Sequence, residues 1–382
     1  MPSHRHAELL ERFRAGHRTA LARAITIVEN ERPDFQRLLS ELHPSVGGAH
    51  RVGITGPPGA GKSTLTSALV RLYRERGETV GVVAVDPTSP FTGGALLGDR
   101  IRMNDVALDD GVFIRSMATR GSLGGLALAT REVADVMDAF GFDRVLIETV
   151  GVGQSELDIA AAADTTVVVL VPESGDSVQA MKAGLMEAAD LFVINKADRP
   201  GAMRLAKEVE LMIHFRLGQT GKAPAHHGVD LGATARAGGA ARSDGAVREP
   251  GAAGAEGVGG ANRAAPRHMT VEERRKRRRG EPEGGWSIPV LQTIAETGKD
   301  VDGLVAKLDA HRAWLSESGE LERRRRDRLS ERVREVALRR VQELVWRDGP
   351  GEDILQDSLT ALESGAESPY EVAARIVRAT LG

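Results

Sequence analysis

The chain has 382 residues, of which 41% are hydrophobic, 27% charged and 3% aromatic, and its net charge is −3. This composition is typical of a globular protein with an aliphatic core, and the charge argues against a general nucleic-acid binder. The lack of cysteine excludes disulfides, thiolate metal sites and a cysteine nucleophile. No stretch approaches the ~20 apolar residues of a membrane span, and no signal peptide is recognisable. We therefore expect a cytoplasmic protein with no membrane or nucleic-acid partner.

The first 48 residues have the spacing of amphipathic helices. Leu9, Leu10 and Phe13 fall on one helical face, and similar stripes continue to about residue 39. Pro33 marks a turn or a helix start. Nothing here points to catalysis, so residues 1–48 are expected to form a helical N-terminal extension packed on the main domain.

A phosphate-binding motif begins at residue 56. It has the pattern G-x-x-x-x-G-K-[ST] and lies between a short β-like run and apolar residues at helical spacing. Its glycines let backbone N–H groups approach phosphate oxygens, Lys62 should contact the β- and γ-phosphates, and the Ser63 hydroxyl should bind Mg²⁺. The predicted nucleotide-binding residues of this loop are Gly56, Pro57, Pro58, Gly59, Ala60, Gly61, Lys62, Ser63 and Thr64.

Strand and helix patterns alternate over residues 51–197, which predicts an α/β fold with a mostly parallel sheet. Most predicted strands are continuous apolar runs, as expected for strands buried on both faces. Ligands of such sheets bind at the carboxyl ends of the strands, so the polar residues there are candidate site residues. The predicted strands are Val52–Thr55, Val80–Val85, Val112–Ser116, Val145–Glu148, Thr166–Val171, Leu191–Asn195 and Val290–Ile294.

Three acidic residues at or after strand ends are candidates for metal and catalytic roles. Glu148 ends one strand at the position of a Walker-B acid, although Asp is commoner there. Gly151, three residues on, can donate its N–H to a γ-phosphate and move when that group leaves. Asp86 ends a second strand, and Asp99 lies in the glycine-rich segment that follows. A helix cap or a turn is the alternative role for these two aspartates.

The base is predicted from Asn195-Lys196-Ala197-Asp198, which follows a strand. The Asp198 carboxylate can accept hydrogen bonds from N1–H and the 2-amino group of guanine, whereas adenine offers neither donor. Lys196 would lie along the nucleotide with its aliphatic stem. With the phosphate-binding loop, this motif favours GTP over ATP.

An insertion at about residues 218–280 interrupts the α/β pattern, and its residues 218–262 are rich in glycine and alanine. It has too few large apolar residues to offset its ordering entropy, so a disordered insertion is expected. A basic run at residues 274–279 is interpreted as solvated linker charge, and an anion-contact site is the alternative.

The last segment, residues 303–382, is again predicted to be helical. A long helix whose opposite face is rich in arginine has an apolar stripe of Leu329, Val333, Val336, Val341, Leu344 and Val345. Two interpretations stay open: the stripe packs on its own domain, or it forms an oligomer contact.

Four segments together carry a family resemblance: Asp86–Met103, Arg115–Leu126, Glu148–Glu156 and Gly175–Asp190. They resemble the MeaB/ArgK-type G-protein chaperones of adenosylcobalamin-dependent acyl-CoA mutases, which include the human methylmalonic aciduria type A protein and belong to the SIMIBI division of P-loop GTPases. The resemblance spans about residues 18–217 and 286–382, and ETVGVGQSE combined with DPTSPFTGGALLGDR is much rarer than a P-loop.

The resemblance implies a role for each matching position. Lys62 and Ser63 would contact phosphate and Mg²⁺, and Asp86 and Glu148 would be metal-site acids of two switches. Asp99 would be a switch acid recruited in the partner-bound state. Guanine would be held by Asn195, Lys196, Asp198 and the backbone N–H of Ala295. A third switch that relays the nucleotide state would include Gly175, Asp176, Gln179 and Lys182. The chain departs from the family in having Ile294 where Ser is common and in its insertion.

The implied fold is a mostly parallel P-loop NTPase sheet of SIMIBI type, with a GTPase domain at residues 49–302 and a helical dimerisation arm at 303–382. The implied function is GTP hydrolysis with Mg²⁺ by a homodimeric chaperone that gates cofactor loading, protection and reactivation of a mutase, most closely methylmalonyl-CoA mutase, without itself binding cobalamin. Val152 stands where Ras-like proteins have a water-orienting glutamine, and the first glutamine is Gln154. Slow intrinsic hydrolysis, accelerated by the mutase, is therefore expected.

Three alternatives are weighed against this function. A nickel-type metallochaperone GTPase of the same division would need Cys or clustered His ligands, and His226-His227 lies in the low-complexity insertion. A kinase or ATPase linked to amino-acid transport is disfavoured by the guanine motif and by the lack of a membrane segment. A nucleotide-gated scaffold with negligible turnover is the third, and a phosphate-release assay distinguishes it.

Overall fold

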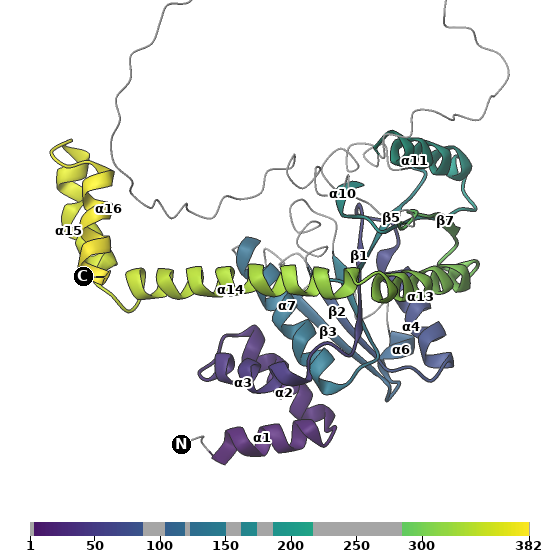
Figure 1. Ribbon diagram of the computed structural model, residues 1–382, viewed down its shortest axis with the longest axis horizontal. Helices are drawn as coiled ribbons and strands as arrows, with labels where there is room; N and C mark the ends of the chain where they lie inside the picture. The colour runs from purple at the N-terminus through teal and green to yellow at the C-terminus, as the bar shows by residue number, and fades with distance from the viewer. Residues whose placement is uncertain are drawn as a thin grey trace, which may run out of the picture. The chain divides into compact units, whose positions relative to one another are not determined.

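The computed structural model describes residues 4–86, 104–118, 123–149, 162–173, 186–216 and 285–381. Within them, seven strands form one sheet in the order β3-β2-β4-β1-β5-β6-β7, and all neighbouring strands are parallel (Figure 1). The strands are β1 (His50–Thr55), β2 (Val80–Asp86), β3 (Val112–Ala118), β4 (Arg144–Thr149), β5 (Thr165–Leu170), β6 (Leu191–Asn195) and β7 (Val290–Thr293). The predicted fold class is confirmed: each predicted strand is present, and its ends differ by no more than two residues.

Helices cover both faces of the sheet (Figure 1). The described helices are α1 (His4–Arg14), α2 (Arg18–Glu29), α3 (Phe35–Leu42), the 3₁₀ turn η1 (His43–Ser45), α4 (Lys62–Glu75), α6 (Asn104–Ala107), α7 (Leu123–Phe140), α10 (Met186–Ala188), α11 (Ala202–Arg216), α13 (Val301–Glu317), α14 (Glu320–Trp346), α15 (Gly351–Glu363) and α16 (Pro369–Leu381). Helices α4 and α13 share one hydrophobic core with the sheet, whereas α1, α2, α3, α7 and α11 pack on its other face.

The strands alternate between these two cores residue by residue. On β4, Leu146 belongs to the same core as Leu69 of α4, whereas Val145 and Ile147 belong to the core that includes Val136 of α7. Successive side chains of a strand point to opposite faces, so a strand covered on both sides must be apolar throughout. This explains why the predicted strands are uninterrupted apolar runs.

Helix α14 is attached to the rest of the chain by its arginine face. Arg324 donates to Asp190 and Arg325 to Asp164, each at 2.9 Å. The apolar stripe points elsewhere, since Leu329 and Val333 are 47% and 68% exposed. The described part of the chain therefore leaves most of the stripe exposed, whereas Val336 and Val345 are half-buried, and an oligomer contact stays a prediction. Helices α15 and α16 lie side by side beyond α14 (Figure 1).

The chain divides into two compact units, Met1–Ile213 with Ile288–Gly382, and His214–Ser287. The predicted insertion at about residues 218–280 belongs to the second unit and lies outside the described residues. The division into an extension, a central domain and an arm, with limits at residues 48 and 302, stays a prediction. Among the helices that the structure describes, none has the length and apolar character needed to cross a membrane.

Candidate nucleotide-binding site

The loop between β1 and α4 starts after Thr55, and the helix begins at Lys62. Three of its glycines have positive φ: Gly56 at +142°, Gly59 at +75° and Gly61 at +83°. A Cβ on Gly56 would lie 2.0 Å from the carbonyl oxygen of Val169 on β5. The residue after β1 must therefore be glycine both for its backbone angles and for the close approach of the neighbouring strand.

Lys62 lies inside the loop and is 6% exposed. Its Nζ donates to the carbonyl oxygens of Gly56 at 2.9 Å and Pro57 at 3.0 Å. These carbonyls hold the ammonium group over the loop, where it is available to exchange a carbonyl partner for a phosphate oxygen. A charge-assisted bond to phosphate is stronger than a bond to a neutral carbonyl, which favours that exchange.

Ser63 and Glu148 form the centre of the candidate metal site. Ser63 Oγ donates to Glu148 Oε1 at 2.6 Å, and the two residues are 7% and 4% exposed. Thr66, fully buried on the next turn of α4, has its Oγ1 3.0 Å from Glu148 Oε2. A carboxylate and a hydroxyl are hard oxygen donors of the kind that Mg²⁺ prefers, so the residues present fit that ion.

The register of the sheet explains why Glu148 reaches the loop. Glu148 is paired with Ile54 of β1 on one side and with Ala84 of β2 on the other. Because all three strands run parallel, their carboxyl ends meet at one edge. Asp86 ends β2 at this edge, paired with Ala118 of β3, and its side chain is not described.

Several predicted site residues lie outside the described part of the chain. They are Asp99, Gly151, Gly175, Asp176, Gln179 and Lys182.

Asn195 joins the candidate base site to the phosphate-binding loop. It is 2% exposed, its Nδ2 donates to the Ala60 carbonyl at 2.8 Å, and its Oδ1 accepts the backbone N–H of Ala295 at 3.0 Å. A Cβ on Gly61 would lie 2.4 Å from the same Nδ2, so glycine is required there too. Three chain segments that are far apart in sequence thus meet at one amide side chain.

Lys196 and Asp198 follow Asn195 at the end of β6. Lys196 has a positive φ of 56°, unusual for a residue with a side chain, and its Nζ donates to the Gly59 carbonyl at 2.9 Å. The lysine therefore lies across the open side of the phosphate-binding loop, while Asp198 is exposed. The structure brings the loop, the guanine motif, Ala295 and Glu148 to one edge of the sheet.

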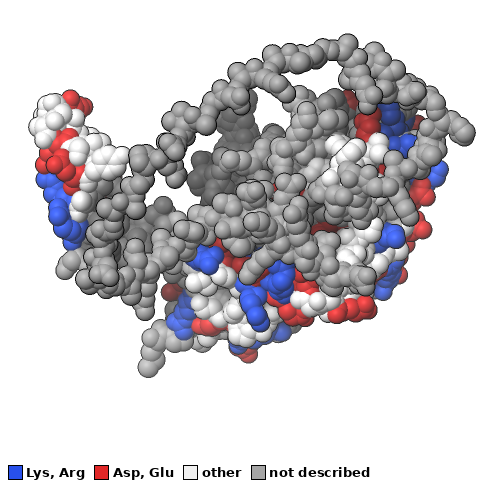
Figure 2. Space-filling view, turned by 45° about the horizontal axis from the view of Figure 1, so that its top comes forward, with Lys and Arg blue, Asp and Glu red and all other residues white. Residues whose placement is uncertain are grey.

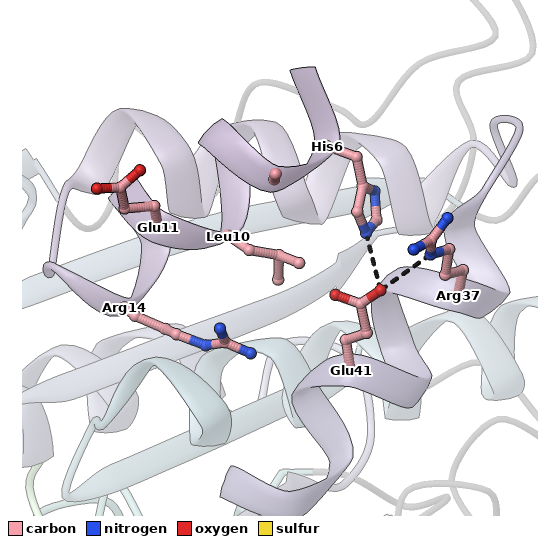
Figure 3. A pocket seen from close by; sticks show the side chains of 7 residues that line it. His6, Leu10, Glu11, Arg14, Arg37 and Glu41 are labelled. Carbon is pink, nitrogen blue, oxygen red and sulfur yellow. Dashed lines mark hydrogen bonds and ion pairs between the residues drawn. The ribbon is translucent and has the colours of Figure 1, made fainter. Parts of the chain in front are cut away.

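A separate cavity of about 360 Å³ lies between α1 and α3 (Figure 3). Its lining includes Leu10, Arg14 and Glu41, and Glu41 is paired with Arg37 at 2.9 Å and with His6 at 3.4 Å. The hydrogen bond from Arg37 keeps the pKa of Glu41 below its usual value. None of the predicted site residues lines this cavity, so it is not the nucleotide site.

Basic and acidic side chains are mixed on the face of the molecule that Figure 2 shows. Where described residues form the face drawn in Figure 2, Lys and Arg are interspersed with Asp and Glu, and that part shows no extended field of one sign.

The family model described as "Methylmalonyl Co-A mutase-associated GTPase MeaB" matches residues 21–349, which is most of the chain. The chain belongs to this family. It is therefore a P-loop GTPase, whose fold implies binding of GTP and GDP and the usual dependence on Mg²⁺.

Individual relatives agree with the family assignment. A putative GTPase of Pyrococcus horikoshii is 43% identical over 329 residues, covering 86% of this chain and 84% of the relative. The mitochondrial methylmalonic aciduria type A homolog of Mus musculus is 41% identical over 197 residues, or 48% of each chain. A crystal structure titled LAO/AO transport system kinase is similar with a TM-score of 0.61 and 25% identity, covering 99% of this chain and 98% of that one.

Sequence reasoning missed one polar residue of this site, Thr66. The signal was a hydroxyl three residues after Ser63, because residues three apart share a helical face. It also missed the buried hydroxyl pair of Thr149 and Thr55, 3.2 Å apart at the ends of β4 and β1.

Proposed function

We propose that this GTPase is a chaperone of an adenosylcobalamin-dependent acyl-CoA mutase, with methylmalonyl-CoA mutase as the preferred partner, and that it gates loading, protection and reactivation of the mutase cofactor. The observation that carries the proposal is the family match over residues 21–349, since the family description names association with that mutase. The name of the mouse relative, a methylmalonic aciduria type A homolog, supports it. No direct binding of cobalamin is proposed.

In the proposed mechanism, the chain positions GTP and a water molecule rather than reacting covalently. Lys62 would exchange its carbonyl partners for phosphate oxygens, and the loop N–H groups would hold the remaining phosphate charge. Ser63 and Glu148 would hold Mg²⁺, which when bound neutralises the charge that develops on the phosphates. Asn195 would hold the base motif at a fixed position relative to the phosphate-binding loop, and Asp198 would accept the hydrogen bonds of guanine.

Nucleotide state would be read by switch residues assigned through the resemblance. Asp86 and Asp99 would serve the first switch, and Gly151 the second. The third switch, Gly175, Asp176, Gln179 and Lys182, would contact the mutase. GTP can change the state of the mutase only if these segments make different contacts with the mutase in the two nucleotide states.

We also propose that the chain is a homodimer through the apolar stripe of α14. Leu329, Val333 and Val341 are 47%, 68% and 44% exposed, although the opposite face of the same helix is attached to the domain by ion pairs. A second copy would bury this stripe and remove an exposed apolar surface.

The experiment that tests the function is a phosphate-release assay of the purified chain with GTP and Mg²⁺, with and without a cobalamin-dependent mutase. Slow release that rises when methylmalonyl-CoA mutase is added is the expected result. Fast release that no mutase changes would contradict the chaperone function. Negligible turnover in both cases would favour the nucleotide-gated scaffold. Nickel binding with no response to mutase would favour the metallochaperone alternative.

A further inference from the structure

The two oxygens of the Glu148 carboxylate contact two different hydroxyl groups of α4. Oε1 accepts the hydrogen bond of Ser63 at 2.6 Å, and Oε2 lies 3.0 Å from Thr66 Oγ1. Ser63 and Thr66 are three residues apart, so both face β4 from the same side of the helix. Only the Ser63 hydroxyl belongs to the phosphate-binding motif.

The Thr66 hydroxyl has a choice of acceptors. It lies 2.9 Å from the backbone carbonyl of Lys62, an ordinary contact for threonine inside a helix, and 3.0 Å from Glu148 Oε2. A hydroxyl has one proton, and a bond to a charged carboxylate is stronger than a bond to a carbonyl that already has a helical partner. Thr66 is fully buried, so no bulk water competes at this position.

We propose that Thr66 is a positioning residue for the metal site, which holds Oε2 of Glu148 so that Oε1 stays directed at Ser63 and the ion. This inference rests on the proposed metal role of Glu148. Glutamate has one more rotatable bond than the aspartate that is common at this position, so its carboxylate samples more orientations unless its second oxygen is fixed. Thr66 supplies that restraint from the next turn of the same helix that carries Ser63.

The test measures the Mg²⁺ concentration that gives half-maximal GTP hydrolysis by the full-length chain. Thr66→Val keeps the volume and the β-branch but removes the hydroxyl, and we expect the half-maximal Mg²⁺ concentration to rise roughly fivefold to tenfold, as for loss of one ordinary hydrogen bond. Thr66→Ser restores a hydroxyl and should return the value toward that of the parental chain. GDP affinity in EDTA gives a second readout, which loss of a metal-site restraint should leave near the parental value.

Ser67→Ala is the matched control. Ser67 is the next residue of α4, is 2% exposed, and donates to the Ser63 carbonyl at 3.0 Å without contacting Glu148. Removing its hydroxyl deletes a buried helical hydrogen bond of the same kind, so Mg²⁺ dependence should stay unchanged even if thermal stability falls. If Thr66→Val unfolds, Thr66→Ala and Thr66→Ser replace it in the comparison.

The Glu148→Gln variant distinguishes an error in the positioning role of Thr66 from an error in the metal role of Glu148. If Glu148→Gln raises the half-maximal Mg²⁺ concentration and the Thr66 variants do not, Thr66 has no positioning role. If Glu148→Gln itself leaves Mg²⁺ dependence unchanged, the metal assignment of Glu148 is wrong. In the Glu148→Gln background, Thr66→Val should raise the half-maximal Mg²⁺ concentration little further, because the side chain that Thr66 positions is no longer a metal-binding carboxylate.

Discussion

Asn195 Nδ2 donates a hydrogen bond to the carbonyl oxygen of Ala60 at 2.8 Å, and this bond connects the guanine motif to the phosphate-binding loop. The same side chain accepts the backbone N–H of Ala295 from the segment after β7. We therefore expect binding of the base and binding of the phosphates to depend on this one buried amide.

Asn195→Ala should weaken GDP and GTP binding together. It leaves the Ala60 carbonyl and the Ala295 N–H without their partner in a buried position, at a cost of about 1–3 kcal/mol each if water does not replace the amide. Isothermal titration and thermal melts should show both weaker binding and lower stability. Unchanged affinity for both nucleotides would show that Asn195 does not couple the two motifs.

Asp198→Asn should change the base that the chain prefers. An amide in place of the carboxylate keeps an acceptor for N1–H, but it offers a donor to the 2-oxo group of xanthine and no longer accepts from the 2-amino group of guanine. We expect hydrolysis of GTP to fall and hydrolysis of xanthosine triphosphate to rise. Because Asp198 is exposed, the variant should fold as the parental chain does, so unaltered nucleotide preference would refute the base assignment.

Asp164→Asn should destabilise the attachment of α14. Burial acts to raise the pKa of Asp164, but the hydrogen bond from Arg325 and the charge of Arg328 outweigh it and keep the pKa well below its usual value. The neutral side chain would leave two arginines with a weaker partner, at a cost of roughly 3 kcal/mol. Chemical unfolding measures this cost. The stability from this depressed pKa is present above the ordinary carboxyl pKa and is lost only at more acidic pH.

Acid should destabilise the chain through two buried histidines. Burial, reinforced by Arg144, lowers the pKa of His50 from 6.5 to about 3, and burial lowers that of His311 to about 4. Both rings contact the Thr165 hydroxyl at 2.8 Å. A folded pKa below the unfolded one means that protons bind the unfolded chain preferentially. Stability should therefore fall below pH 6.5 by about 1.4 kcal/mol per pH unit for each histidine until its folded pKa is reached.

Unfolding measured between pH 7 and pH 4 checks this dependence, and His50→Gln is the variant to compare. Glutamine offers an acceptor toward Arg144 and a donor toward Thr165 but does not titrate. Its stability should fall less steeply with acid than that of the parental chain. Equal slopes for the two proteins would exclude His50 as a source of the acid sensitivity.

Val333→Glu should shift the proposed dimer toward monomer. Val333 is 68% exposed on the apolar stripe of α14, and a copy packed there would have to bury the new charge. Light scattering over a dilution series measures the change. Gln342→Glu adds the same charge at an exposed position on the other side of the helix and should leave the mass unchanged. If the parental chain is monomeric at every concentration, the stripe has no self-association role.

The sequence by itself determined the fold class, the strand order along the chain and the phosphate-binding loop. These features depend on local patterns: uninterrupted apolar runs for strands buried on both faces, and glycines where the backbone needs positive φ. The motif after β6 likewise follows from its residue types and its place after a strand. Several strand ends differ from the prediction by one or two residues, because where a strand stops depends on neighbouring strands that a local pattern does not contain.

Only the tertiary structure decided which side of α14 faces the domain and which hydroxyl groups contact Glu148. The arginine-rich face of α14 pairs with buried carboxylates of α7 and of the residues just before β5 and β6, and most of the apolar stripe stays exposed. Thr66 gained its role from Glu148, which lies far away in sequence and is brought beside it by the pairing of β4 with β1. Contacts of this kind depend on strand order and register, which decide which residues distant in sequence become neighbours.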